Sequence, residues 1–212
     1  MNVSVYREPF TFIVIDNWLD DSVNQWFLNS IDVVLPYMQS SKVGIIGGSV
    51  IAPMVKSSMN LWMFQHQTAQ LDSPNFTKLF EDNLWSKEMR EIFMNTGDSA
   101  FQQILYTNHS QLLLSKYVEG DHYGWHRDYC PTVTVNYMLA KEPLKFEGGE
   151  FVFGSWDDKE ARHTVDFKNN RLVIFPSRVY HKVQPVKNFT GATNEARFTL
   201  QYWSQMKERR ED

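Results

Sequence analysis

The half of the chain after His109 consists of short apolar or alternating runs separated by glycines and charged residues, and this pattern constrains the fold most. The runs cover 111–118, 132–139, 149–153, 171–175, 182–186 and 197–203. Runs of this length and spacing are typical of β-strands, and no helical pattern separates them as a parallel sheet would require. We therefore predict an all-β second half, folded as a sandwich, jelly roll or barrel.

The first half of the chain carries helical patterns instead. An apolar run at 10–15 predicts one strand, closed by a turn at 16–17. Apolar residues then recur at helical spacing through 20–35 and again through 76–105, where the sequence at 95–97 predicts a break between two helices. We expect this half to be mainly helical.

The segment 40–58 is rich in glycine and serine and contains Pro53. This is the composition of a long loop or mobile hairpin rather than of a regular element. Loops of this kind often close over a bound ligand. We therefore predict that the segment is a lid or a peptide clamp.

Length and composition limit the possible functions. A chain of 212 residues is short for two full-sized domains, so we expect one domain over 1–212. The net charge of −4 lacks the positive footprint of a nucleic-acid binder, so no nucleic-acid partner is expected. The single cysteine, Cys130, excludes an intrachain disulfide and a cysteine-rich metal site. No signal peptide or membrane span is recognisable, so we expect a cytoplasmic protein without membrane contact; the oligomeric state stays open.

Three residues have the types and the spacing of a metal site. His126 and Asp128 are two positions apart, which at the end of an extended strand puts both side chains on one face. His181 lies 53 residues further on, between two predicted strands. Two histidines and one carboxylate can hold a non-haem Fe(II) ion and leave three coordination positions open. His66, His109 and His163 are interpreted as solvent residues.

A basic residue follows the second histidine on the last predicted strand. Arg197 and Thr199 share one face of that strand, because Phe198 and Leu200 mark the opposite face. A guanidinium can bind a carboxylate in bidentate fashion, so this pair suits the far end of a dicarboxylate. Lys187 remains a rival basic partner for the same carboxylate.

These pieces together resemble a known family, the Fe(II)- and 2-oxoglutarate-dependent dioxygenases, in their prolyl 4-hydroxylase-like branch. The resemblance covers about 112–203 and depends on the order of six motifs. They are YVEGDHYGWHRD from Tyr117 to Asp128, YML at 137–139, GGEF at 148–151, LVIFP at 172–176, HKVQPV at 181–186 and RFT at 197–199.

The resemblance implies an α+β fold with a double-stranded β-helix core of the jelly-roll or cupin type, about 109–205, braced by helices mainly within 1–108. It implies that His126, Asp128 and His181 are the catalytic metal ligands. Arg197 and Thr199, with Tyr117 and Tyr137, would bind the cosubstrate. The implied cofactors are Fe(II), 2-oxoglutarate and O₂, and the family also admits ascorbate. Because histidine ligands must be neutral, we expect iron affinity to fall as the pH drops through about 6 to 7.

The resemblance also suggests a reaction. The implied enzyme is an oxygenase that hydroxylates an unactivated C–H bond, most readily of a prolyl residue in a peptide or protein, with release of succinate and CO₂. Two alternatives stay open: an oxygenase acting on a free amino acid, and a non-catalytic cupin-like module that binds a metal or ligand. Arg197 speaks against a plain metal hydrolase, which has no need of an arginine opposite three open metal positions.

Overall fold

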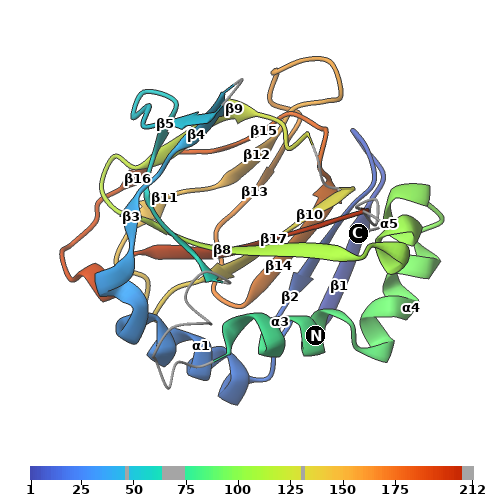
Figure 1. Cartoon of the computed structure of the whole chain (residues 1–212), viewed down its shortest axis with the longest axis horizontal. Coiled ribbons are helices and arrows are strands. Elements are labelled where there is room, and N and C mark those ends of the chain that lie inside the picture. Colours follow the sequence, from blue (N-terminus) through green and yellow to red (C-terminus); the bar gives the residue numbers. More distant parts are fainter. Residues whose placement is uncertain (46–47, 64–74, 130–131, 207–212) are drawn as a thin grey trace, which may run out of the picture.

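Two antiparallel β-sheets face each other, and helices cover the outer face of the larger sheet (Figure 1). The computed structural model describes residues 1–45, 48–63, 75–129 and 132–206. In these ranges the larger sheet has eight strands in the order β1-β2-β14-β10-β17-β8-β7-β3. The smaller sheet has five strands in the order β13-β12-β15-β9-β6. This is the arrangement expected of the predicted jelly roll.

In the second half of the chain β8, β10, β14 and β17 match predicted runs, whereas β9 and β13 were not predicted as runs and the run 182–186 falls on β15 and β16. The strands of the larger sheet are β1 (Asn2–Tyr6), β2 (Phe12–Asp16), β3 (Gln39–Ser40), β7 (Met59–Trp62), β8 (His109–Tyr117), β10 (Val133–Leu139), β14 (Arg171–Pro176) and β17 (Arg197–Gln205). Those of the smaller sheet are β6 (Lys56–Ser57), β9 (His122–His126), β12 (Phe151–Phe153), β13 (His163–Val165) and β15 (His181–Val183). Two further pairs of short strands join β4 (Val43–Ile45) to β5 (Gly48–Val50), which are close in sequence, and β11 (Glu147–Gly148) to β16 (Val186–Lys187), which are far apart in sequence.

The larger sheet has a buried core on each of its faces. On β17, Phe198, Leu200 and Tyr202 belong to the apolar cluster between this sheet and the helices. Residues of alternate parity on the neighbouring strands, such as Met138, belong to a second cluster that also holds Phe151 of the smaller sheet. Because side chains alternate along a strand, the sheet presents one apolar face to the helices and a second, more polar face to the space between the sheets.

The first half contributes more strands and shorter helices than the sequence predicts. Its helices are α1 (Asp21–Val34), α3 (Phe76–Leu84), α4 (Lys87–Asn95) and α5 (Ser99–Gln103), followed by 3₁₀ turns at Leu35–Tyr37 and Ile104–Tyr106; a third turn lies at Thr193–Glu195. The predicted break after Asn95 is present. A second break, at Trp85, was not predicted. It arises where Ser86 caps the N-terminus of α4 by accepting a hydrogen bond from the Met89 N–H. The expected helices are present in this half, and the short strands β1 to β7 lie there as well, of which the sequence predicts only the one at 10–15.

The segment 40–58 was predicted to be a loop or mobile hairpin without regular elements, but it holds short strands, of which β4 and β5 pair with each other. The flanking strands β3 and β6 attach this segment to both sheets. Its role as a lid stays a prediction. In the described part of the chain, none of the helices is long and apolar enough to span a membrane.

Candidate metal centre and its buried arginine

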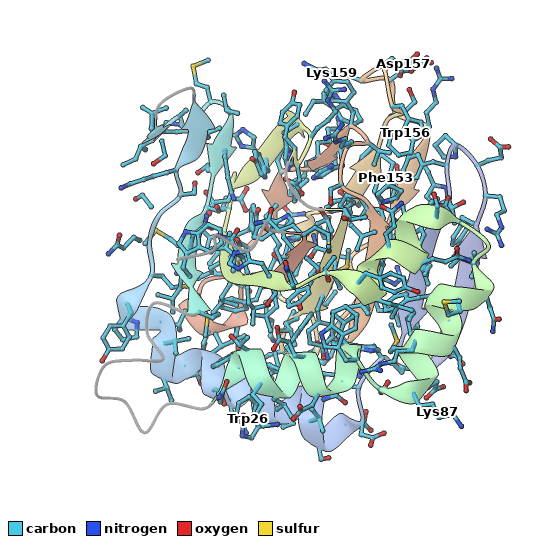
Figure 2. The ribbon with its side chains drawn as sticks, turned by 45° about the vertical axis from the view of Figure 1, so that its right-hand side comes forward. Trp26, Lys87, Phe153, Trp156, Asp157 and Lys159 are labelled. Atoms are coloured by element: carbon cyan, nitrogen blue, oxygen red, sulfur yellow. The ribbon has the colours of Figure 1, made fainter. Side chains whose placement is uncertain are left out.

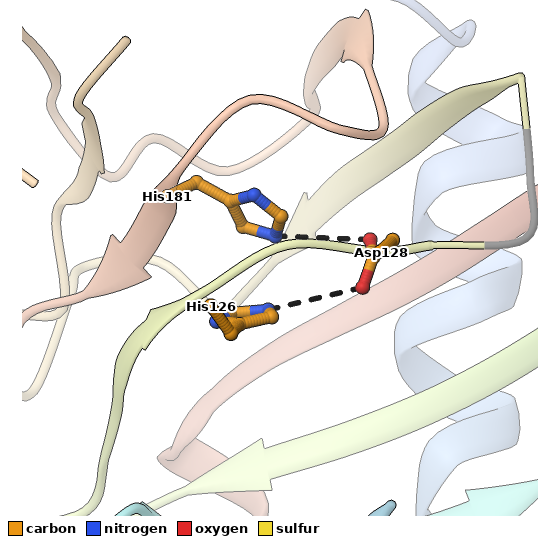
Figure 3. Close-up of side chains that lie close together, drawn as sticks. All are labelled: His126, Asp128 and His181. Atoms are coloured by element: carbon orange, nitrogen blue, oxygen red, sulfur yellow. Dashed lines mark ion pairs between the residues drawn. The ribbon is translucent and has the colours of Figure 1, made fainter. Parts of the chain in front are cut away.

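The three predicted metal ligands meet at one end of the smaller sheet (Figure 3). His126 ends β9, His181 begins β15, and the two are paired across antiparallel strands. Asp128 lies two residues beyond β9, with its carboxylate 4.0 Å from Nε2 of His126 and 3.7 Å from Nε2 of His181. Ligand atoms of all three lie within 4.8 Å of one another. The backbone thus assembles a two-histidine, one-carboxylate set that fits a divalent metal ion.

Backbone carbonyls orient both imidazoles toward this point. Nδ1 of His126 donates to the Gly124 carbonyl and Nδ1 of His181 donates to the Val179 carbonyl, each at 2.9 Å. These bonds place the proton on Nδ1 and leave Nε2 free to bind a metal. The imidazole orientation is therefore set by the protein before a metal binds.

The carboxylate of Asp128 is held by two side chains that the sequence did not single out. Its Oδ2 accepts hydrogen bonds from the Thr134 hydroxyl and from the Trp203 indole N–H, both at 2.8 Å. Its backbone N–H donates to the Ser177 carbonyl at 2.9 Å. Partners of this kind orient metal ligands and tune the metal. Nothing in the sequence pattern distinguishes Trp203 from an ordinary core tryptophan.

Burial changes the expected pH dependence of metal binding. It lowers the pKa of His126 well below the ordinary 6.5, an effect that the adjacent His181 reinforces. Burial also lowers the pKa of His181, against the opposing effect of Asp128. Both imidazoles therefore take up a proton at a lower pH than an ordinary histidine does.

We accordingly predict that Fe(II) affinity is constant from about pH 7.5 down to 6.5 and falls only at lower pH, where protons begin to compete for the imidazoles. Competition with a chromophoric chelator, measured anaerobically at each pH, checks this. A steady loss of affinity between pH 7.5 and 6.5 would show that the histidines titrate normally.

Arg197 lies on the inner face of the larger sheet, as the strand alternation predicts. It is fully buried and next to Tyr117, its cross-strand partner, whose ring centroid lies 4.7 Å from the guanidinium carbon. Its Nε donates to the Gly149 carbonyl at 2.9 Å. Burial lowers the pKa of Arg197 to about 10, so the guanidinium remains charged at neutral pH.

The outward nitrogens of this guanidinium have no partner in the described part of the chain. Nη1 and Nη2 of Arg197 are buried without a hydrogen bond, and so is the hydroxyl of Thr199. The Tyr117 hydroxyl is buried near Ser58 and Gln201 without a hydrogen bond of good geometry. Buried donors without acceptors are costly, so this set fits an anionic ligand that supplies the acceptors. The far carboxylate of 2-oxoglutarate has the required charge and fork geometry.

Gly149 positions Arg197 by leaving room for it. Gly149 has a φ of +70°, and a Cβ there would lie 2.5 Å from Cδ of Arg197. We predict that Gly149→Ala displaces the guanidinium and weakens 2-oxoglutarate binding roughly tenfold or more, because a small misplacement of a positioning group is costly. Gly97→Ala is the matched control, since Gly97 has the same φ and no atom within 4 Å of a Cβ. Calorimetric titration with 2-oxoglutarate distinguishes the two variants; equal affinities would contradict the prediction.

Two residues considered for cosubstrate binding, Tyr137 and Lys187, lie away from Arg197. Tyr137 was expected at the cosubstrate, but its hydroxyl donates to Asn24 at 2.7 Å and to Asn170 at 3.1 Å on the helix side of the sheet. That prediction was wrong: Met138, and not Tyr137, points into the space between the sheets. Strand β10 is buried on both faces, so the hydrophobicity of its residues does not reveal which side chains point inward. Lys187 is exposed on β16, where it lies opposite Glu147 in the strand register, so it does not compete with Arg197 for the carboxylate.

Sequence reasoning also missed Lys56 and misread one histidine. Lys56 lies on the short strand β6, is 5% exposed and lies over the Tyr123 ring. A single lysine in a glycine- and serine-rich segment gives no periodic signal that could reveal its burial. His163, interpreted as a solvent residue, is partly buried against Phe12, which lowers its pKa. His66 lies outside the described residues.

A wide cleft opens outside the metal ligands. It has a volume of about 920 Å³, and its lining is rich in aromatic side chains, namely Trp62, Tyr123, Trp125, Tyr129, Tyr180 and Trp203. Val43 and Gly44 of the 40–58 segment also line it. The cavity directly between the ligands and the inner sheet is narrow, so a bound cosubstrate requires its side chains to move apart. An extended substrate can reach the ligands through the wider cleft.

Comparisons with known proteins agree with this geometry. Residues 112–205 match the model of the 2OG-Fe(II) oxygenase superfamily. No curated protein matches the sequence.

Solved structures share the fold. One is a prolyl hydroxylase from Trichoplax adhaerens in complex with a hypoxia inducible factor oxygen degradation domain peptide fragment (TM-score 0.67, 16% identity, 92% of this chain and 83% of that chain). Another is a prolyl-4-hydroxylase from Pseudomonas putida (TM-score 0.62, 16% identity, 92% of each chain). A third is the viral collagen prolyl hydroxylase of Paramecium Bursaria Chlorella virus-1 in its 2OG complex (TM-score 0.53, 15% identity, 92% and 96%). Because the sequence identities are this low, the similarity establishes only a shared fold, the double-stranded β-helix core.

Proposed function

We propose that this 2OG-Fe(II) oxygenase hydroxylates an unactivated C–H bond of a prolyl residue in a peptide or protein, with release of succinate and CO₂. The observation that carries the proposal is that the His126, Asp128 and His181 set lies together with the buried guanidinium of Arg197, whose Nη1 and Nη2 have no hydrogen-bond partner in the described part of the chain. The first fits the metal and the second fits a dicarboxylate cosubstrate.

Fe(II), 2-oxoglutarate and O₂ supply the oxidising chemistry when bound: one oxygen atom goes to succinate as CO₂ leaves, and the other is inserted into the C–H bond. The chain's own residues hold and orient the reactants. Arg197 and Thr199 would bind the far carboxylate of the cosubstrate, with Tyr117 beside them. His126, Asp128 and His181 would hold the ion through three of its coordination positions, and the others would stay open to the cosubstrate and O₂.

The aromatic cleft supports a substrate with apolar rings and an extended chain. Trp125 and Tyr180 line it together with the cation of Arg127, which lies 4.4 Å from the Tyr180 ring centroid. A prolyl ring is an apolar body that aromatic walls can position. The prolyl hydroxylases among the structural neighbours support the same substrate class.

The test incubates the purified protein with Fe(II), 2-oxoglutarate, O₂ and a panel of proline-containing peptides and free amino acids. The proposal expects succinate to form in proportion to a product heavier by one oxygen atom, located on proline by fragmentation. Modification of a free amino acid alone would favour the alternative oxygenase. Bound metal without any 2-oxoglutarate binding would favour the non-catalytic module.

A further inference from the structure

A second cation lies in the space between the sheets, close to the metal ligands. Lys56 belongs to β6, whose neighbour β9 places Tyr123 directly opposite. The Nζ of Lys56 lies 4.4 Å from the Tyr123 ring centroid, and that ring stacks on the His126 imidazole with centroids 3.5 Å apart. The Tyr123 ring therefore lies between the ammonium of Lys56 and the metal ligand His126.

This ammonium lacks an acidic partner. No carboxylate in the described part of the chain lies within 4 Å of Nζ of Lys56, although the charge of Asp128 acts on it from further away. The side-chain oxygen of Asn60, in the orientation that satisfies its hydrogen bonds, accepts one bond from Nζ at 3.3 Å. One neutral acceptor leaves most of the cost of burying a charged amine uncompensated.

The charges of the metal, the cosubstrate and their direct partners would balance without Lys56. A divalent iron and the Arg197 guanidinium carry three positive charges, and Asp128 and doubly charged 2-oxoglutarate carry three negative ones. Lys56 therefore adds one positive charge in a partly desolvated space. Glu150 is a further acid whose charge acts on Arg197, but it makes no ion pair with Lys56, so an anion in contact with Nζ would have to come from a ligand.

The cavity beside Lys56 has room for that anion. Its volume is about 400 Å³, and its lining includes Gln201, Trp203 and Asp128, with the exposed Lys42 as a further cation. Asp128 is the acid of this lining and is engaged by Thr134 and Trp203. The cavity shares Tyr123 and Asp128 with the wide cleft, so a substrate in the cleft can extend into it.

We propose that Lys56 binds a carboxylate of the substrate, so that the oxidised residue is a C-terminal prolyl residue with a free carboxylate. This inference rests on the proposed oxygenase function and narrows its substrate class. A carboxylate supplies both the charge and the hydrogen-bond acceptors that Nζ of Lys56 lacks.

The test uses N-acetyl-L-proline and N-acetyl-L-prolinamide, which differ by one negative charge. Each is titrated calorimetrically into the anaerobic Fe(II)- and 2-oxoglutarate-loaded protein, as wild type, Lys56→Met and Lys56→Arg. Lys87→Met is the control, because Lys87 is an exposed lysine at the opposite end of the molecule from Lys159 of the cleft (Figure 2).

We expect the wild type to bind the carboxylate roughly 10- to 100-fold more tightly than the amide, Lys56→Met to remove this preference, Lys56→Arg to retain part of it, and Lys87→Met to leave it unchanged. The melting temperature of Lys56→Met should not fall, because methionine fills the same space without a buried charge. Equal binding of the two probes by the wild type, or no binding of the carboxylate, would overturn the inference.

The 2-oxoglutarate affinity of Lys56→Met shows whether Lys56 binds a carboxylate of the substrate or one of the cosubstrate. An affinity within about twofold of wild type supports the substrate assignment. A large loss would assign Lys56 to the cosubstrate and overturn the inference, while the oxygenase function would stand. Failure of the wild type itself to bind 2-oxoglutarate would instead contradict the proposed function.

Discussion

Asp128→Asn is expected to abolish 2-oxoglutarate turnover and to weaken Fe(II) binding by at least about 100-fold, because it removes the only anionic ligand of the proposed set. The asparagine oxygen can still accept from Thr134 or Trp203, as the aspartate does at 2.8 Å, so the fold should persist. Iron content after anaerobic loading and desalting, with succinate formation on the same sample, measures both effects.

Asp82→Asn is the control for this substitution. Asp82 is an acid on α3 whose side chain is 58% exposed, and its partner is Lys78. The same change of charge at that surface should leave iron content and turnover at wild-type values. Full iron occupancy and turnover in Asp128→Asn would show that the carboxylate is not a ligand.

Arg197→Met is expected to weaken 2-oxoglutarate binding roughly 100-fold or more while leaving Fe(II) binding intact. The substitution removes two charged donors, Nη1 and Nη2, which the structure leaves free for an anion. Because Arg197 lies on the larger sheet and the metal ligands on or beside the smaller one, iron and cosubstrate binding should separate. Calorimetric titration with 2-oxoglutarate and a parallel iron assay measure the two affinities.

Lys187→Met is the matched control for Arg197→Met. Lys187 is the basic residue that the sequence leaves as an alternative, and the structure exposes it on β16. Its substitution should not change 2-oxoglutarate affinity. A loss in Lys187→Met together with normal binding in Arg197→Met would reverse the assignment.

The sequence predicts the site best where the backbone geometry is simple. His126 and Asp128 are two positions apart at the end of a strand, so their side chains share a face whatever the rest of the fold does. Arg197 was placed correctly because the apolar residues Phe198 and Leu200 mark one face of its strand and leave the other to polar groups. These two predictions needed only the alternation of side chains along a strand.

The prediction failed where both faces of a strand are buried or where an element is very short. Strand β10 is buried along its whole length, so alternation does not tell whether Tyr137 or Met138 points inward. Strand β6 has two residues and no pattern of its own, yet its pairing with β9 buries Lys56 beside the metal centre. Such placement depends on tertiary pairing, which local sequence does not encode.

The most direct test of the account is the anaerobic visible absorption of the Fe(II)-loaded wild-type protein before and after addition of 2-oxoglutarate. Chelation of Fe(II) by a 2-oxo acid gives a metal-to-ligand charge-transfer band. The account predicts that this band appears in the wild type, needs a far higher 2-oxoglutarate concentration in Arg197→Met, and is absent in Asp128→Asn. Bound iron in the wild type without any band would contradict the assignment of this site to an Fe(II)- and 2-oxoglutarate-dependent reaction.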